Sequence, residues 1–381
     1  MCLNLALSTA QPAAAIATTA DLPPELAKLL APPSPWGASA RVEAMAGYKD
    51  NLLLSSTGEE RSAFVRASAQ IVVLRLPQKA FDYSLLAEVA GTRYLDGQRY
   101  ADGTSTKHDA RAYLRNEIGW SPAKTLRLSL PLDACYQDQV IDQSDTEFTR
   151  EISAIQAGIA KLGPTVRWTF HPAWWVEAQA SGELKRFRGG ANDGDVGEGA
   201  LRLGWRPLPR LKVRLGAEER WHGFERRAQF SAAGRELAGT ALKVAAREGE
   251  LRLDYAWDRD SHWQTSTRAG VLAYRDNGSG YFSYREKSAG QEIEWNRGPW
   301  LLGLCGTARR VDFEVQTVGF GLAPPPRVRD EFTAELRAER QVTKRWAIFV
   351  RFEWERSRSN DPLSCYVVNE GLLGVRWSWD K

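Results

Sequence analysis

The 381-residue sequence has few of the residues from which metal centres and redox sites are built. It contains two methionines, four histidines and four cysteines. Cys2, Cys135, Cys305 and Cys365 form no CxxC pair and have no metal-ligand spacing with the histidines. We therefore expect no metal and no cofactor. We interpret the cysteines as isolated small residues. In an oxidising compartment, a disulfide between Cys135 and Cys305 is an alternative.

Long apolar runs and an excess of one charge are also missing. No stretch approaches the roughly 18 uncharged apolar residues of a membrane helix. This excludes a helical membrane protein but leaves a barrel open, because only alternate residues of a barrel wall face lipid. The 51 basic and 47 acidic residues give a net charge of +4, which is too balanced to indicate a nucleic-acid partner.

Tryptophan, in contrast, is abundant, and its placement is the most informative feature of the chain. Ten of the fifteen tryptophans flank a short turn, and the last two fall in the final five residues. An indole ring prefers the boundary between hydrocarbon and water. In a transmembrane barrel the short turns all lie at one membrane face, where an aromatic girdle forms. We expect the membrane-interface aromatics to be Trp120, Trp168, Trp174, Trp205, Trp257, Trp263, Trp295, Trp300, Trp346, Trp377 and Trp379.

From Trp36 onward, apolar and polar residues alternate with the period of two that is typical of strands. In 211–220, for example, Leu211, Val213 and Leu215 oppose Lys212 and Arg214. Extending this template along the chain predicts about sixteen strands, with fourteen to eighteen acceptable. They are 36–49, 61–76, 80–94, 107–120, 125–137, 147–170, 174–188, 197–206, 210–226, 240–257, 262–275, 280–295, 299–318, 329–341, 345–358 and 365–380. The longest, 147–170, is expected to contain a bulge near Gly163 and Pro164.

The predicted connections alternate between short and long without a break. Seven are short: 77–79, 121–124, 171–173, 207–209, 258–261, 296–298 and 342–344. Eight are longer and polar: 50–60, 95–106, 138–146, 189–196, 227–239, 276–279, 319–328 and 359–364. Short periplasmic turns and long extracellular loops predict this alternation. The fold class is therefore all-β, a transmembrane antiparallel up-and-down β-barrel of about sixteen strands over 36–381, with both chain ends on the short-turn side.

The N-terminal segment has a different character. Met1 to Ala15 is apolar and small and ends in three alanines, but no Lys or Arg precedes Lys28. Residues 1–20 fit a signal peptide truncated at its start, or a disordered Ala/Thr leader. The proline-rich stretch 21–35 is expected to be a periplasmic linker.

The end of the chain carries a resemblance. In the segment 371–381, Leu373, Val375, Trp377 and Trp379 share one face, and Asp380 and Lys381 follow the last aromatic. This segment resembles the C-terminal signal strand of bacterial outer-membrane barrels, which usually ends on the aromatic itself. The resemblance implies a place in the bacterial outer membrane, with membrane lipid and the barrel-assembly machinery as partners.

Two shorter stretches resemble the β-barrel porins found with bacterial exopolysaccharide export systems. They are 47–56 at the first long loop, and 356–361 with Tyr366 and Asn369 at the last. The match covers about twenty residues, so it implies the fold and carries no catalytic or binding residue across.

If the apolar faces meet lipid, the opposite faces line the lumen. Charges so dense require water or ion pairing, since an unpaired buried ion costs several kcal/mol. Residues 202–220 are mostly basic and 335–355 mostly acidic, on strands about six positions apart. A basic row facing an acidic row across the lumen would set up an electric field that orients polar solutes. Alternatively, these charged side chains pair with neighbouring side chains on the wall. The expected lumen charges include Arg202, Arg206, Lys212, Arg214, Arg220, Arg252, Glu335, Arg337, Glu339, Arg351, Glu353 and Glu355.

The sequence gives only weak indications of a catalytic site or a metal site. His108, His222 and His262 lie near polar residues but form no recognisable triad. The run 192–195 with Glu198 offers hard oxygen ligands but lacks the full calcium-loop spacing, so a polar turn is expected there. We expect no enzyme, but a porin-like channel for polar solutes or polysaccharide. The alternatives are a non-conducting secretion or assembly-accessory barrel, an outer-membrane hydrolase, and a soluble β-rich protein.

Overall fold

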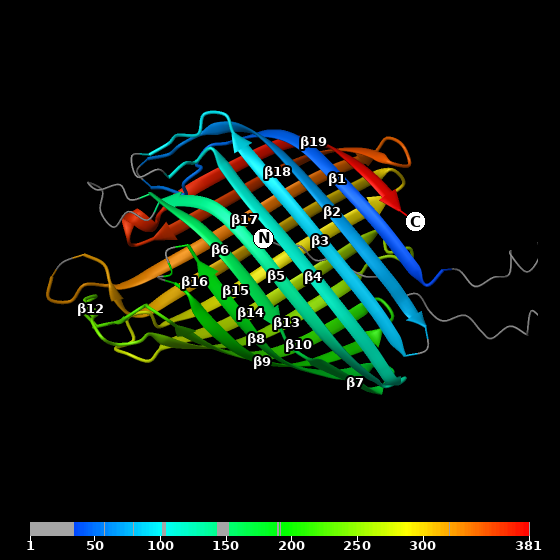
Figure 1. Cartoon of the computed structure of the whole chain (residues 1–381), viewed down its shortest axis with the longest axis horizontal. Coiled ribbons are helices and arrows are strands. Elements are labelled where there is room, and N and C mark those ends of the chain that lie inside the picture. The colour runs from blue at the N-terminus through cyan, green and yellow to red at the C-terminus, as the bar shows by residue number, and fades with distance from the viewer. Residues whose placement is uncertain are drawn as a thin grey trace, which may run out of the picture.

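The structure, a computed structural model, describes residues 34–56, 58–78, 80–100, 104–142, 152–188, 190, 192–319 and 321–380. These residues form one closed antiparallel β-barrel (Figure 1). The expected signal peptide at 1–20 and nearly all of the linker at 21–35 lie outside the described residues. Within the described part, the helical content is the three-residue 3-10 turn η1 (Pro362–Ser364), and no helix is long and apolar enough to cross a membrane.

Each strand pairs with its neighbours in sequence, and the last pairs with the first, so the wall is continuous. The strands are β1 (Trp36–Lys49), β2 (Ser62–Gln78), β3 (Phe81–Tyr94), β4 (His108–Ala123), β5 (Leu126–Asp142), β6 (Ile152–Leu162), β7 (Thr165–His171), β8 (Trp174–Phe187), β9 (Gly194–Leu208), β10 (Leu211–Phe224), β13 (Lys243–Ala256), β14 (Trp263–Asp276), β15 (Tyr284–Arg297), β16 (Trp300–Thr317), β17 (Pro326–Gln341), β18 (Trp346–Ser359) and β19 (Tyr366–Asp380). Since β6 and β7 together fill one position between β5 and β8, the wall has sixteen positions, as predicted.

The break between β6 and β7 falls at Gly163 and Pro164, where the sequence predicts a bulge. A Cβ atom at Gly163 would lie 2.1 Å from the carbonyl oxygen of Ala180, so only glycine fits against β8. Pro164 has no N–H to give to a ladder, and it accordingly lies between the two strand segments.

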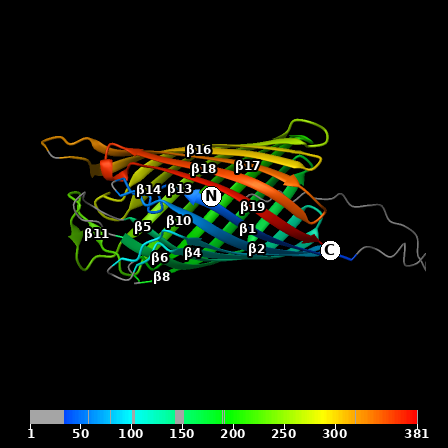
Figure 2. The same ribbon diagram turned by 90° about the horizontal axis from the view of Figure 1, so that it is seen from above.

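The two ends of the barrel differ. The start of β1, the end of β19 and the short turns lie at one end, here called the short-turn end (Figure 1). The longer connections lie at the opposite, long-loop end, where the loop after β10 forms a small hairpin, β11 (Gln229–Phe230) and β12 (Glu236–Leu237). Seen from a second direction, β1 and β19 again lie side by side (Figure 2).

Alternation along each strand divides apolar from polar faces. On β18, Ile348, Val350 and Phe352 face outward and are 46%, 52% and 44% exposed, while the intervening Phe349 is 3% exposed. A large apolar side chain left half exposed on a continuous wall is unfavourable in water and favourable in lipid. The outer surface is therefore the apolar one, and the inner surface carries most of the charge.

The structure corrects some details of the sequence-based expectations. Cys135 and Cys305 are not joined to one another, so the Cys135–Cys305 disulfide does not form. The predicted 147–170 is two strands, and the predicted strand 280–295 runs instead from Tyr284 to Arg297. The hairpin β11–β12 lies in a segment predicted as loop, because its pairing depends on the loop around it and not on alternation.

Candidate functional site: the inner wall and the two rims

The turn-flanking tryptophans form a ring around the short-turn end. The strand registers place Trp174 opposite Trp205, Trp263 opposite Trp295, and Trp346 opposite Trp377. Of the eleven expected interface aromatics, Trp174, Trp295 and Trp377 are half-buried and the other eight are exposed: Trp120, Trp168, Trp205, Trp257, Trp263, Trp300, Trp346 and Trp379.

An apolar band of limited height lies above this ring. On β18 the outward positions are apolar from Trp346 to Trp354, and the next outward position is Arg356. The ten residue steps from Trp346 to the charged Arg356, at about 3.3 Å each on a strand tilted by about 40°, limit the height of the band to about 25 Å. On β10 and β13 the band ends at the outward pair Glu219 and Arg247, whose atoms lie 2.9 Å apart. This height fits the apolar band of a membrane barrel.

The charges predicted for the lumen all lie on the inner face, and most are paired. Arg202 bonds Glu177, Arg214 bonds Asp254, and Arg351 bonds Glu353, each within 3.1 Å. The remaining predicted residues are placed as follows: Arg220 contacts Glu218 and Glu248, Arg252 contacts Asp254, Arg337 and Arg376 contact Glu339, and Glu355 accepts from the Tyr366 hydroxyl. Among the described residues, Glu335, Arg206 and Lys212 have no ion pair.

Inner charges halfway along the barrel remain accessible to water. The side chains of Arg115 on β4, Arg309 on β16 and Glu353 on β18 are 47%, 49% and 39% exposed. Each lies near the middle of its strand and on a different part of the wall. The interior at mid-height is therefore wide enough to hold water against the charged wall.

The wall is filled differently where the first and last strands meet. Six inner side chains from this region form an apolar cluster: Met45, Leu52, Phe64, Tyr94, Phe349 and Leu372. Beside it, Glu370 bonds Arg66 at 2.8 Å, and Glu339 accepts from both Arg337 and Arg376. We call this region, the inner face of β17–β19 and β1–β3, the seam wall.

The first long loop is packed onto the long-loop end of the seam wall. Asn51 and Leu53 are fully buried, and Asp50 accepts hydrogen bonds from the backbone and side-chain nitrogens of Asn369 at 2.7 and 2.6 Å. The side chain of Asn51 also donates to the Val367 carbonyl. The first long loop is thus joined to β19 at one rim.

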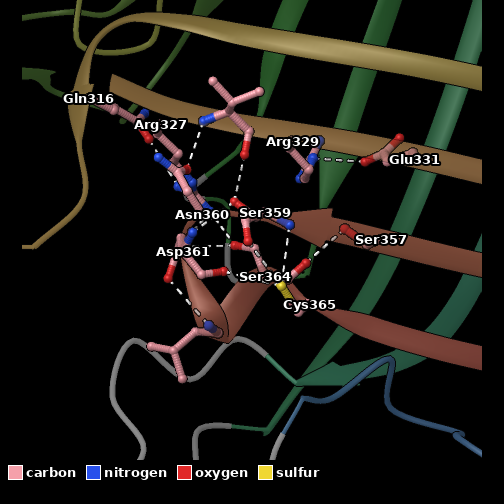
Figure 3. A network of polar contacts seen from close by, with 12 residues as sticks. Gln316, Arg327, Arg329, Glu331, Ser357, Ser359, Asn360, Asp361, Ser364 and Cys365 are labelled. Atoms are coloured by element: carbon pink, nitrogen blue, oxygen red, sulfur yellow. Dashed lines mark hydrogen bonds and ion pairs between the residues drawn. The ribbon is translucent and has the colours of Figure 1, made fainter. Parts of the chain in front are cut away.

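The last long loop is fixed to the wall by a polar network (Figure 3). Arg327 on β17 lies 3.0 Å from Asp361 and donates to Gln316 at 2.9 Å and to Ser364. The backbone N–H of Ser359 donates to the sulfur of Cys365 at 3.2 Å. These contacts hold η1 and the loop around it at the rim.

The residues considered for catalysis or calcium have ordinary structural partners. His262 hydrogen-bonds Asp258 at 2.7 Å in a short turn, and within the described ranges no hydroxyl or thiol bonds its ring. Asp258, Asp260 and His262 lie close enough together to hold a cation, on an exposed turn where such acidic groups are common. Asp193 accepts from the backbone N–H of Phe187. The other candidate calcium ligands contact basic residues, with Asn192 near Arg227, Asp195 near Arg186 and Glu198 near Lys161.

Two inner residues were not among the expected lumen residues. Trp175 points inward and is 6% exposed, and Arg167 on β7 stacks on its ring at 4.6 Å. The alternation could have indicated Trp175, because its neighbour Trp174 faces outward and adjacent strand residues face opposite sides.

No protein family and no curated protein matches this sequence. Among solved structures, the chain is similar to OccAB1 of Acinetobacter baumannii, with 10% identity, a TM-score of 0.48, and coverage of 90% of this chain and 96% of that one. It is also similar to a loop-deletion form of OmpT, an outer-membrane protein of Vibrio cholerae, with 10% identity, a TM-score of 0.47, and coverage of 90% and 98%. OpdL of Pseudomonas aeruginosa gives 10% identity, a TM-score of 0.43, and coverage of 91% and 99%. At these values the similarity carries no inference about ligand or activity.

Proposed function

We propose that this protein is an outer-membrane channel for polar solutes. The observation that carries the proposal is the pair of surfaces on one wall. Half-exposed apolar side chains cover the outside, and half-exposed charged side chains such as Arg115, Arg309 and Glu353 line the inside at mid-height. A sixteen-strand barrel is wide enough for an aqueous channel, and an apolar outer wall suits a bilayer.

Two features support an orientation in a bacterial outer membrane. The tryptophan ring lies at the end that carries both strand termini, which corresponds to the periplasmic interface of such barrels. The loop-bearing end, with the polar rim network of Arg327 and Asp361, would then face the exterior. Membrane lipid would cover the apolar band, and the barrel-assembly machinery would engage β19.

The solute would be a small polar molecule or a polysaccharide. Inner charges of both signs favour a hydrated solute over an apolar one. The link to polysaccharide rests on the stretches 47–56 and 356–361, which resemble export-associated porins.

Conductance in a planar bilayer tests the proposal. We expect refolded protein, shown to be folded by its heat-dependent shift in gel mobility, to give steady single-channel currents. Denatured protein in the same detergent is the control. Currents that fall when oligosaccharide is added would favour polysaccharide as the solute, and currents that do not fall would favour small polar solutes. A sealed bilayer over folded protein would overturn the channel and favour an accessory barrel.

A further inference from the structure

Three cations on the inner face of β7, β9 and β10 have no carboxylate partner among the residues that the structure describes. Most inward-facing Arg and Lys residues of the described chain have an acidic oxygen within 4.0 Å, as Arg127 and Lys161 do. Arg167, Arg206 and Lys212 have none. Of these three, Arg167 and Lys212 both approach the ring of Trp175, at 4.6 and 5.6 Å from its centre. Arg206 is close enough to act electrostatically on both of them.

Trp175 forms the base of this cluster. Its indole extends from β8 across β9, where a Cβ atom on Gly204 would lie 1.9 Å from the ring. The ring therefore rests on the backbone of Gly204 and has 6% of its surface exposed. A ring fixed in this way holds the two cations over its face by cation–π attraction.

A β-bulge brings the third cation to the same place. The pairing of β9 with β10 shifts between Leu211 and Val213, so that Arg206 and Pro207 lie opposite Lys212 alone. Bulges redirect side chains at the rims of barrels, and they also accommodate a proline within a strand. The bulge places Arg206 beside Lys212 at the short-turn end of the lumen.

The nearest carboxylates are already engaged elsewhere. Glu177 lies opposite Arg167 in the register but bonds Arg202 at 3.1 Å. Asp254 lies opposite Lys212 but bonds Arg214 and Arg252 at 3.1 and 2.7 Å. The positive charge of the cluster is therefore left uncompensated by its own wall.

We propose that Arg167, Arg206 and Lys212 form a binding station for an anionic group, a carboxylate or a phosphate, carried by a solute in the channel. Two guanidinium groups and an ammonium on three strands offer several donors to one anion, and charge-assisted hydrogen bonds of this kind are strong. Trp175 and Gly204 are positioning residues for the cations. The station rests on the proposed channel function, since a solute reaches it through the lumen.

The test is the block of single-channel current by inorganic phosphate or by acetate at constant ionic strength. We expect phosphate to block the wild-type channel, and R167Q and K212Q each to raise the half-blocking concentration roughly tenfold. The anion-to-cation permeability ratio from reversal potentials should fall in the same variants. R247Q removes the same charge from an exposed outward position and serves as the matched control. Block by acetate with the same dependence would favour carboxylates, and block by phosphate alone would favour phosphorylated solutes.

Gly204→Ala separates a built station from a diffuse positive field. It keeps every charge but forces the indole off the backbone, so the half-blocking concentration should rise although the net charge is unchanged. Unaltered block in folded G204A, R167Q and K212Q would overturn the station. Phosphate titrated calorimetrically into the protein in detergent keeps the two proposals distinct. If the wild-type protein does not conduct but binds phosphate, and R167Q loses this binding, the channel function would be refuted and the anion site supported. If the protein conducts but does not bind phosphate, the channel function would be supported and the anion site refuted.

Discussion

The seam wall and the wall formed by β7–β10 are built from the same alternating strands, yet their inner faces differ. The seam wall holds a buried apolar cluster around Phe64 and Phe349, and its carboxylates Glu339 and Glu370 each lie within 4.0 Å of two arginines. On the β7–β10 wall, Arg167 and Lys212 lie over the ring of Trp175 and have no carboxylate within 4.0 Å among the described residues.

The difference between the two inner faces indicates that closure of the wall and the proposed anion binding depend on different parts of the barrel. Closing the wall requires side chains that satisfy one another, because the strands that meet there come from opposite ends of the chain. The proposed binding of an anionic solute would require groups that have no partner on the wall itself. The outer surfaces of the two walls do not differ in this way, since Val350 on β18 and Leu203 on β9 are both exposed apolar residues.

The largest effect is expected in the apolar cluster of the seam wall. Phe64 is 1% exposed and packs edge-on against Tyr94, with ring centres 5.9 Å apart. Phe64→Ala would leave a cavity and lower the free energy of unfolding by about 3–5 kcal/mol, measured by urea titration in detergent. Ile159→Ala, at a half-buried inner position of β6, should cost about 1 kcal/mol. Equal losses at the two positions would contradict a tighter inner packing of the seam wall than of the inner face at β6.

A smaller effect should be shared by both walls, because it concerns their outer surface. Val350→Arg would place a charge in the apolar band and cost about 2–4 kcal/mol. Leu203→Arg should cost less, because Leu203 lies two residues from the interface residue Trp205. Assembly into liposomes, followed by gel mobility, measures both. Ser129→Arg on the inner face should assemble normally, and assembly that is equally impaired by Ser129→Arg would refute the assignment of inner and outer faces.

The smallest expected effect is on the stability of a short turn that lies outside both walls. In the turn between β13 and β14, the backbone N–H of Trp263 and the ring of His262 lower the pKa of Asp258 from 3.8 to about 2. A lowered folded-state pKa gives stability that is present above pH 3.8 and is lost as the pH falls toward 2. Because Asp258 lies half-buried in a short turn, the change should loosen this turn alone. Protection factors of the amides of residues 258–262 at pH 5 and pH 2.5, corrected for intrinsic exchange, measure it, and Asp258→Asn should remove the difference between the two pH values.

Much of the fold could be predicted from the sequence because lipid imposes a strict pattern. Each strand must present apolar residues at every second position between interface aromatics. This pattern is visible within a few consecutive residues, as in Leu211 to Leu215. The break at Gly163 and Pro164 was also predictable, since proline cannot donate to the ladder. The sixteen wall positions and the alternation of short and long connections followed from the same two signals.

The inner face was less predictable because its pattern is set by contacts across the barrel. Phe64 and Phe349 are apolar residues on the side expected to be polar, and only the packing of the first loop explains them. The hypothesis of opposed basic and acidic rows missed the pairing within β17 and β18, where Arg337 bonds Glu339 and Arg351 bonds Glu353. Which cations stay unpaired depends on registers that alternation does not reveal.

The pairing of β1 with β19 has a consequence for how the molecule forms. Eleven residue pairs, from Ser39–Asp380 to Lys49–Glu370, join segments separated by more than 300 positions along the chain. Contacts at such separation carry a large loop-closure entropy and slow folding. Until β19 is in place, β1 and β18 each present an open edge of hydrogen-bonding groups, which is a hazard for mispairing. The fifteen residues of β19 (Tyr366–Asp380) therefore close the wall, because they alone join β18 to β1 within the described barrel.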